Sequence, residues 1–140
     1  MSGTATALDH VGIAVGDLAA ARTAWKDAGF APTPGGRIML RHGYIELLAP
    51  DAARPSATLA AMLAQGEGAH VLSLRVADAA AAAERLRRAG GGGEMVENAR
   101  PGEAAGSGTA RFRRVPLTDA LPRLQLIEQQ KIDKPVLFGH

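Results

Sequence analysis

The chain contains no cysteine, so disulfide bonds, thiolate metal sites and a cysteine nucleophile are all excluded. It also lacks any apolar run approaching the roughly 20 residues that a membrane-spanning helix needs. The first ten residues, MSGTATALDH, have no basic start followed by an apolar core, so we expect no signal peptide. These absences predict a cytoplasmic protein that is not inserted in a membrane.

An excess of charge of one sign is missing too. The sequence has 16 Lys and Arg residues against 14 Asp and Glu residues, which gives a formal net charge of +2. Its densest basic cluster, residues 111–114, carries only Phe112 as an aromatic partner. Because nucleic-acid binding needs massed basic side chains, we do not expect a nucleic acid as partner. With 140 residues, of which 46% are hydrophobic, the chain is long enough for one domain with a sizeable core.

An internal repeat is the most informative feature that is present. Residues 9–29 read DHVGIAVGDLAAARTAWKDAG, and residues 69–90 read AHVLSLRVADAAAAAERLRRAG. Each copy has a His-Val start, a short apolar run, an Asp, an Ala-rich stretch and a closing Gly. A spacing of about 60 residues is too long for a solenoid unit, so the repeat predicts a duplicated module folded as two halves of one domain.

The pattern within each copy predicts a strand followed by a helix. Asp17 and Asp78 are good N-caps, and Gly29 and Gly90 stand where the two helices should end. A further short helix is expected from Ser56. The remaining apolar runs predict strands at 37–42, 44–48, 94–98, 110–116 and 123–129, with one more strand of the first half only weakly marked.

Two βαβββ modules in tandem predict an α+β fold in which a curved, mixed β-sheet forms a cup. We expect one domain over residues 1–140, with the inward-facing strand residues lining a ligand site. Its parts are a first module at 7–50, a linker at 51–68, a second module at 69–130 and a C-terminal tail at 131–140, which is apolar enough to dock on the body or on a second subunit.

Several segments together carry a family resemblance. They are LDHVGIAVGDLAAARTAWKDAGF, GYIELLAP, HVLSLRVADAAAAAERLRRAG, and ARFRRVPL followed by PRLQLIEQQ. With them the chain resembles the glyoxalase/bleomycin-resistance group, also called the vicinal oxygen chelate superfamily, and most of all its glyoxalase-like domain branch. The resemblance implies a small-molecule ligand and a homodimer. It does not fix the activity, because the superfamily spans isomerases, lyases, dioxygenases, thiol transferases and metal-free binding proteins.

The resemblance also implies positions for a metal site. In metal-using members, four inward side chains, usually His, Glu or Gln, His and Glu, hold one divalent ion such as Zn, Ni, Mn or Fe. His10 matches the first position and Glu46 the second. Gln125 aligns best with the fourth and leaves Glu128 on the opposite face, although a register shift of one residue would exchange the two.

The repeat is imperfect at the third position. His10 lies seven residues before Asp17, but the residue seven before Asp78 is Val71, and His70 lies eight before it. Because side chains alternate along a strand, this offset turns His70 away unless a β-bulge restores it. With Val71 in that place, a full four-ligand site is not expected, and the chain uses either no cofactor or a single divalent metal.

We therefore expect a glyoxalase-like protein that binds a small polar organic molecule in the sheet cavity. His10 and Glu46 are the candidates for acid–base work, such as moving a proton next to a carbonyl. The candidates for substrate binding are Tyr44, Arg41, Arg113 and Gln125. Two alternatives stay open: a divalent-metal lyase, isomerase or dioxygenase with His70 brought in by a bulge, and a non-catalytic binding protein of the bleomycin-resistance type.

Overall fold

The chain folds into two compact units. The computed structural model describes residues 5–91, 94–103, 108–118 and 121–130. The N-terminal unit is built from Leu8–Ser73 with Thr118–Leu124, and the C-terminal unit mainly from Leu74–Leu117 and the segment that begins at Gln125. Because the boundary after Ser73 falls inside a strand, the units do not coincide with the two sequence repeats. The predicted tail at 131–140 lies outside the described residues.

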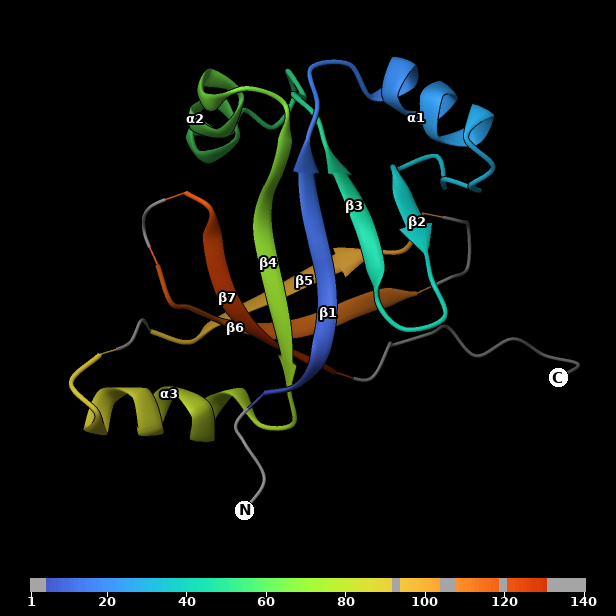
Figure 1. Cartoon of the computed structure of the whole chain (residues 1–140). Coiled ribbons are helices and arrows are strands. Elements are labelled where there is room, and N and C mark those ends of the chain that lie inside the picture. The colour runs from blue at the N-terminus through green and yellow to red at the C-terminus, as the bar shows by residue number, and fades with distance from the viewer. Residues whose placement is uncertain (1–4, 92–93, 104–107, 119–120, 131–140) are drawn as a thin grey trace, which may run out of the picture. The chain divides into compact units, whose positions relative to one another are not determined.

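The N-terminal unit is a layer of strands with two helices. Its elements are β1 (Ala5–Ala14) from Leu8 onward, α1 (Leu18–Asp27), β2 (Arg37–Met39), β3 (Tyr44–Leu48), α2 (Ala57–Gln65) and the first part of β4 (Gly68–Val76). The strands are hydrogen-bonded in the order β2-β3-β1-β4. Strand β3 is parallel to β1 and antiparallel to β2. Figure 1 shows β1 and β4 side by side, running in opposite directions.

The helices begin where the sequence predicted. The carboxylate of Asp17 accepts a hydrogen bond from the backbone N of Ala20 at 3.1 Å, and the hydroxyl of Ser56 accepts one from the backbone N of Leu59 at 3.1 Å. Such caps stabilise a helix by about 1 kcal/mol. After α1 the chain turns at Gly29, whose φ of +102° favours glycine. No helix in the described part of the chain is long and apolar enough to cross a membrane.

One face of this sheet forms the core of the N-terminal unit. Val15, Ile38 and Leu47 are buried there, and Leu18 and Trp25 of α1 pack against them. Trp25 is therefore part of the packing between helix and sheet. Since strand residues alternate between the two faces, the neighbours of these apolar residues in β2 and β3 lie on the opposite face.

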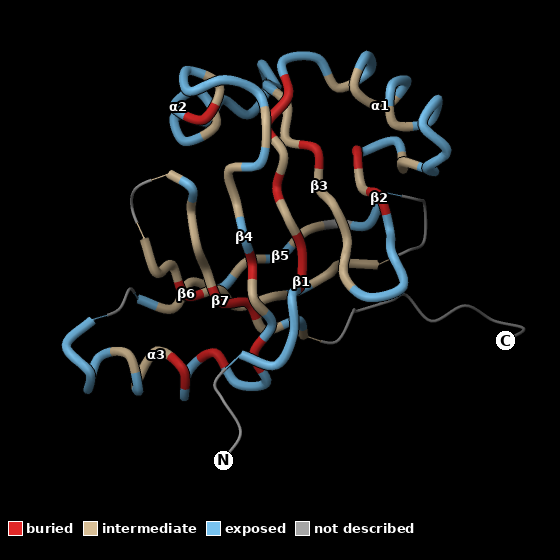
Figure 2. The backbone as a smooth tube through the Cα atoms, in the orientation of Figure 1, coloured by how far each residue is buried: buried red, intermediate tan, exposed pale blue. Residues whose placement is uncertain are grey.

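The C-terminal unit contains the end of β4, α3 (Ala79–Arg88), β5 (Val96–Pro101), β6 (Thr109–Pro116) and most of β7 (Arg123–Gln129). Its strands follow the order β4-β7-β6-β5. The core of this unit consists of Val76, Ala79, Ala82, Val115 and Leu126. Figure 2 shows buried residues in β4 and at the start of α3, where Asp78 caps the helix by accepting from the backbone N of Ala81 at 3.0 Å.

The predicted α+β class with a mixed sheet is confirmed, with two differences in the first half. The weakly marked second strand is absent from the described residues 30–36, where Pro32 and Pro34 have no N–H to donate to a strand ladder. The strand predicted at 37–42 ends at Met39, because Leu40 donates from its backbone N to the carbonyl of Gly43 and closes a turn. The first half is thus βαββ and the second βαβββ.

Candidate functional site

Polar side chains gather on the face of the N-terminal sheet that is turned away from α1. Strand register brings them together: His10 is paired with Tyr44, while Glu46 is paired with Arg37 on one side and with Gly12 on the other. Residues that lie directly opposite each other on neighbouring strands project to the same face. The apolar core on one face therefore leaves a polar group on the other.

His10 is held at both of its ring nitrogens. Its Nδ1 lies 2.7 Å from Oδ2 of Asp9, and its Nε2 lies 3.1 Å from Oγ of Ser73. Asp9 and Ser73 are fully buried, and His10 is 6% exposed. A carboxylate can only accept hydrogen bonds, so Nδ1 donates to Asp9, and in the neutral ring Nε2 accepts from the Ser73 hydroxyl.

Glu46 is the more accessible of the two residues that the sequence predicted for acid–base work. Its side chain is 21% exposed, against 7% for the side chain of His10. Oε2 of Glu46 lies 3.8 Å from Nε2 of His10, and Oε1 lies 4.0 Å from a terminal guanidinium nitrogen of Arg37. A molecule that reaches this face from solvent would therefore meet the Glu46 carboxylate before the His10 ring.

Tyr44 covers one side of the His10 ring. The two rings are stacked, with centroids 4.7 Å apart and planes 15° from parallel. Such aromatic pairs contribute about 0.5–1.5 kcal/mol beyond the area they bury. The stacking adds a steric limit to ring rotation that the hydrogen bonds of Asp9 and Ser73 alone do not provide.

Asp9, His10 and Ser73 are hydrogen-bonded in the order of an orienting acid, a base and a nucleophile. The sequence spacing did not reveal this arrangement. A serine nucleophile must reach the atom that it attacks. Ser73 has an exposed fraction of 0%. Its hydroxyl therefore holds the imidazole ring and does not act on a substrate.

Val71, and not His70, shares the face of His10. Gly12 lies on that face, and a Cβ atom built on Gly12 would be 2.8 Å from the Cβ of Val71. Ser73, two residues further along β4, projects to the same face, since its hydroxyl contacts His10. His70 lies on the other face, where its Nε2 is 2.7 Å from the carbonyl oxygen of Gly66.

A divalent metal, which the resemblance implies, does not fit the polar face. His10 and Glu46 are good donors, but the third position is Val71, and Nε2 of His10 already contacts Ser73 at 3.1 Å. A zinc site normally needs at least three good protein ligands. Within the part of the chain that the structure describes, no group of three or more His, Cys, Asp or Glu side chains is placed to hold an ion.

Of the other sequence candidates, one lies in a turn of the N-terminal unit and two belong to the C-terminal unit. Arg41 is exposed in the turn after β2, outside the strand predicted for it. Arg113 belongs to the C-terminal unit, where its Nε is 3.0 Å from a carboxylate oxygen of Glu97. Gln125 also lies in that unit, on the face of β7 opposite to Leu126. Glu128 lies on the same face as Leu126, since its carboxylate accepts a hydrogen bond from the backbone N of Ala79, at the start of α3, at 2.8 Å.

Three residues that contact His10 or Glu46 were not among the site residues predicted from the sequence. Asp9 directly precedes His10, and only the folded ring geometry shows that it contacts Nδ1. Ser73 could have been found by extending the alternation from Val71 to the next residue on its face. Arg37 is one of several arginines that lie on strands. Its cross-strand pairing with Glu46 distinguishes it from the others.

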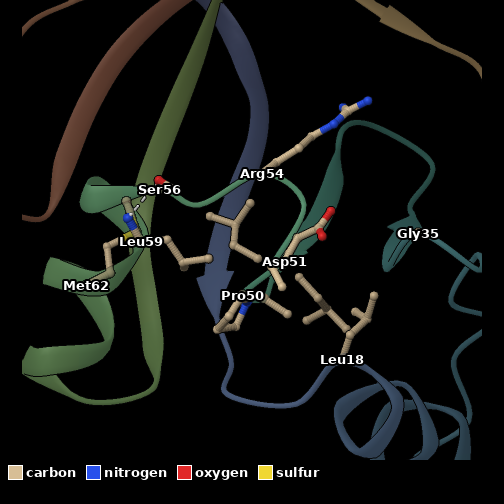
Figure 3. Close-up of a pocket in the computed structure, with 12 residues that line it drawn as sticks. Leu18, Gly35, Pro50, Asp51, Arg54, Ser56, Leu59 and Met62 are labelled. Atoms are coloured by element: carbon tan, nitrogen blue, oxygen red, sulfur yellow. Dashed lines mark hydrogen bonds between the residues drawn. The ribbon is translucent and has the colours of Figure 1, made fainter.

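A cavity of about 620 Å³ opens at the end of β3, beyond Glu46. Figure 3 shows apolar side chains of α1, β3 and α2 turned toward it, with Asp51 and Arg54 on the connecting segment. Leu48 lines the cavity and stands two residues after Glu46 in β3, so both project to one face. The apolar lining is supplied by Leu18, Leu47, Leu48, Pro50, Leu59 and Met62.

Comparison with known proteins connects this fold to one family. A family model described as a glyoxalase-like domain matches residues 8–135. The crystal structure of methylmalonyl-CoA epimerase from Mycobacterium tuberculosis is 29% identical, with a TM-score of 0.67 over 94% of this chain and 93% of that chain. No match was found among the curated proteins.

Two more distant structures agree in fold alone. A variant of Streptomyces coelicolor methylmalonyl-CoA epimerase in complex with 2-nitronate-propionyl-CoA is 22% identical, with a TM-score of 0.60 over 91% of this chain and 99% of that chain. A hypothetical protein from Bacillus halodurans is 19% identical, with a TM-score of 0.60 over 91% of this chain and 97% of that chain.

Proposed function

Because the chain belongs to the glyoxalase-like domain family, we propose that it is an isomerase-type enzyme that moves a proton next to the carbonyl group of a small organic substrate. The observation that carries this proposal is the pair formed by Glu46 and His10, 3.8 Å apart on one polar face. A carboxylate and an imidazole are the side chains most often used to remove and return a proton.

In this proposal Glu46 is the base that touches the substrate, since its side chain is the more exposed of the two. The proton on the carbon next to the carbonyl passes to a Glu46 oxygen. The electrons of the broken C–H bond form a C=C bond, and the carbonyl oxygen becomes an enolate. Delivery of a proton to the opposite face of the same carbon by a second donor, such as solvent water, completes an epimerisation, and return of the proton by Glu46 to another atom completes an isomerisation.

Arg37 supplies the positive charge that this step requires. Its guanidinium lies 4.0 Å from Glu46, so a carbonyl oxygen bound beside the base falls within reach of its N–H groups. Fixed donors aimed at a developing oxyanion are a large source of rate enhancement in partly buried sites. The enolate can therefore be stabilised by the chain's own residues. The proposed mechanism uses no metal, because this face offers too few metal-ligating side chains.

The apolar part of the substrate would lie along the same face. Met39 is 63% exposed beside Tyr44 at one end of this face, and the cavity that Leu48 lines lies at the other end of β3. A pocket of several hundred cubic ångströms suits a small organic molecule. The M. tuberculosis structure is that of a methylmalonyl-CoA epimerase, and epimerisation next to a carbonyl is the kind of proton transfer proposed here.

A homodimer and a cytoplasmic location belong to the same proposal. Both come from the family resemblance and the cysteine-free composition. Light scattering of the untagged chain tests the first of them, and a mass of one chain at all concentrations would contradict it.

Proton exchange with solvent tests the function without knowledge of the product. Untagged, EDTA-treated protein is incubated in D₂O with 2-methyl-branched acyl thioesters, 2-hydroxyaldehydes and 2-oxoacids, and ¹H NMR follows the protons next to each carbonyl. We expect exchange with at least one compound and a loss of about 10²–10⁴-fold in Glu46→Gln. The matched control, His70→Gln on the opposite face, should keep the wild-type rate. Binding of these compounds without exchange would favour the non-catalytic alternative instead.

A further inference from the structure

We propose that Asp9 and Ser73 are positioning residues that fix which nitrogen of His10 carries the proton, keeping it on Nδ1 and leaving Nε2, the nitrogen nearer Glu46, as an acceptor. The catalytic consequence of this arrangement rests on the proposed function. The arrangement itself does not, because the protonated nitrogen can be observed directly.

Asp9 determines the position of the proton. Its carboxylate is fully buried and lies 2.7 Å from Nδ1, so the short contact is satisfied only by an Nδ1–H donor. The backbone of Asp9 is held as well. Gly43, at the turn between β2 and β3, approaches so closely that a Cβ atom there would be 2.7 Å from the Asp9 carbonyl oxygen. Asp9 therefore has little freedom to move away from the ring.

Ser73 holds the other nitrogen without deciding its protonation. A hydroxyl both donates and accepts, so it pairs with Nε2 as a donor when the ring is neutral and as an acceptor when Nε2 carries a proton. The 3.1 Å contact from Oγ to Nε2 keeps the ring in place in both states. Asp9 sets the tautomer, and Ser73 maintains the ring orientation.

This tautomer matters for Glu46. A proton on Nε2 would be hydrogen-bonded to Ser73 Oγ and would still lie near the Glu46 carboxylate, since Oε2 is 3.8 Å from Nε2, so it would stabilise the charged carboxylate and weaken it as a base. With the proton on Nδ1, Nε2 can take the substrate proton from Glu46 once a small side-chain movement shortens the contact and the Ser73 hydroxyl turns from donor to acceptor. The buried Asp9 carboxylate then stabilises the imidazolium that forms.

NMR of the ¹⁵N-labelled, EDTA-treated chain tests the tautomer. Long-range ¹H–¹⁵N correlations of the His10 ring, assigned by their loss in His10→Gln, are recorded at alkaline pH, where further increase in pH no longer changes them. We expect the wild type to carry the proton on Nδ1. Asp9→Asn should move it to Nε2, because an amide can donate to Nδ1, whereas the matched variant Ser73→Ala should leave it on Nδ1.

Wild-type His10 protonated on Nε2 would overturn the proposal, and this single measurement stands even if a variant fails to fold. An Nδ1–H tautomer that persists in folded Asp9→Asn would overturn the role of Asp9. In the exchange assay, Asp9→Asn should lose about 10–100-fold in rate, the usual effect of removing a group that orients a histidine. Exchange that is absent in the wild type despite the expected tautomer would contradict the proposed function and leave the tautomer assignment intact.

Discussion

Val71 packs directly against Gly12: a Cβ atom on residue 12 would lie 2.8 Å from the Cβ of Val71 and 3.1 Å from one of its methyl groups. This contact places Val71 on the face that carries His10 and Glu46. The position at which the family resemblance puts a second histidine is therefore filled by a side chain that has no donor atom. Glycine on β1 provides the space that this valine occupies.

The first prediction concerns this contact. Gly12→Ala should lower the free energy of unfolding by about 1–3 kcal/mol, the usual cost of overpacking a tight interior site. The clash is with the Cβ of Val71, which is fixed to the backbone, so adding Val71→Ala should give little relief. In a Val71→Gly background, Gly12→Ala should cost much less than it does in the wild type, because the clashing Cβ is gone. Urea unfolding of the single and double variants measures the coupling, and additive effects in the Gly12→Ala, Val71→Gly pair would contradict the close contact.

A second prediction tests the metal interpretation by restoring the missing ligand. Val71→His places an imidazole beside His10 and Glu46 and supplies a third good ligand, so Zn²⁺ should bind this variant more tightly than the wild type. Isothermal titration calorimetry measures the affinity. The matched control is Leu72→His, which adds the same group to the opposite face of β4. If the wild type itself retains one Zn²⁺, Ni²⁺, Mn²⁺ or Fe²⁺ per chain and loses it in His10→Ala, the metal-free interpretation is wrong.

The elements around this site were largely predictable from the sequence, because their causes are local. Asp17, Ser56 and Asp78 cap helices through side-chain bonds to backbone groups three residues away. The alternation of apolar and polar residues in YIELL gives the two faces of β3. Counting from the Asp caps also distinguished His70 from Val71, since alternation within one strand depends only on register.

Other features depend on contacts between distant segments, which no local pattern encodes. Ser73 meets His10 because β4 lies beside β1, and the two residues are 63 positions apart in the chain. The repeat suggested two equal halves, yet the first residues of β4 join the N-terminal unit. Arg41 was expected on a strand and is exposed in a turn, because the turn at Gly43 ends β2 early at Met39.

The third prediction concerns the stacked pair of Tyr44 and His10. Tyr44→Leu should destabilise the protein by about 0.5–1.5 kcal/mol more than Tyr44→Phe, because Phe keeps the ring and Leu does not. Urea denaturation measures both variants. Equal destabilisation by the two substitutions would show that the stacking contributes nothing. If Tyr44→Phe keeps its stability but binds the exchange substrate more weakly, the phenol hydroxyl contacts the substrate, as the sequence predicted for Tyr44.

The fourth prediction separates the binding of the substrate's apolar part from the chemistry at Glu46. Leu59 of α2 lines the cavity beyond Leu48, so Leu59→Trp fills space that the apolar part would occupy. In the exchange assay this variant should raise KM about tenfold or more for substrates with a long apolar part, a loss of roughly 1.4 kcal/mol of binding. Its kcat should stay unchanged, because Glu46 and His10 are not touched.

The matched control is Ala64→Trp, which adds the same side chain at an exposed position of α2 and should change neither constant. Short substrates provide a second comparison, since they would not reach the cavity and their KM in Leu59→Trp should equal that of the wild type. A fall in kcat with unchanged KM would mean that α2 positions the catalytic pair and that the cavity does not hold the substrate. Equal increases in KM for short and long substrates would likewise remove the cavity from the binding site.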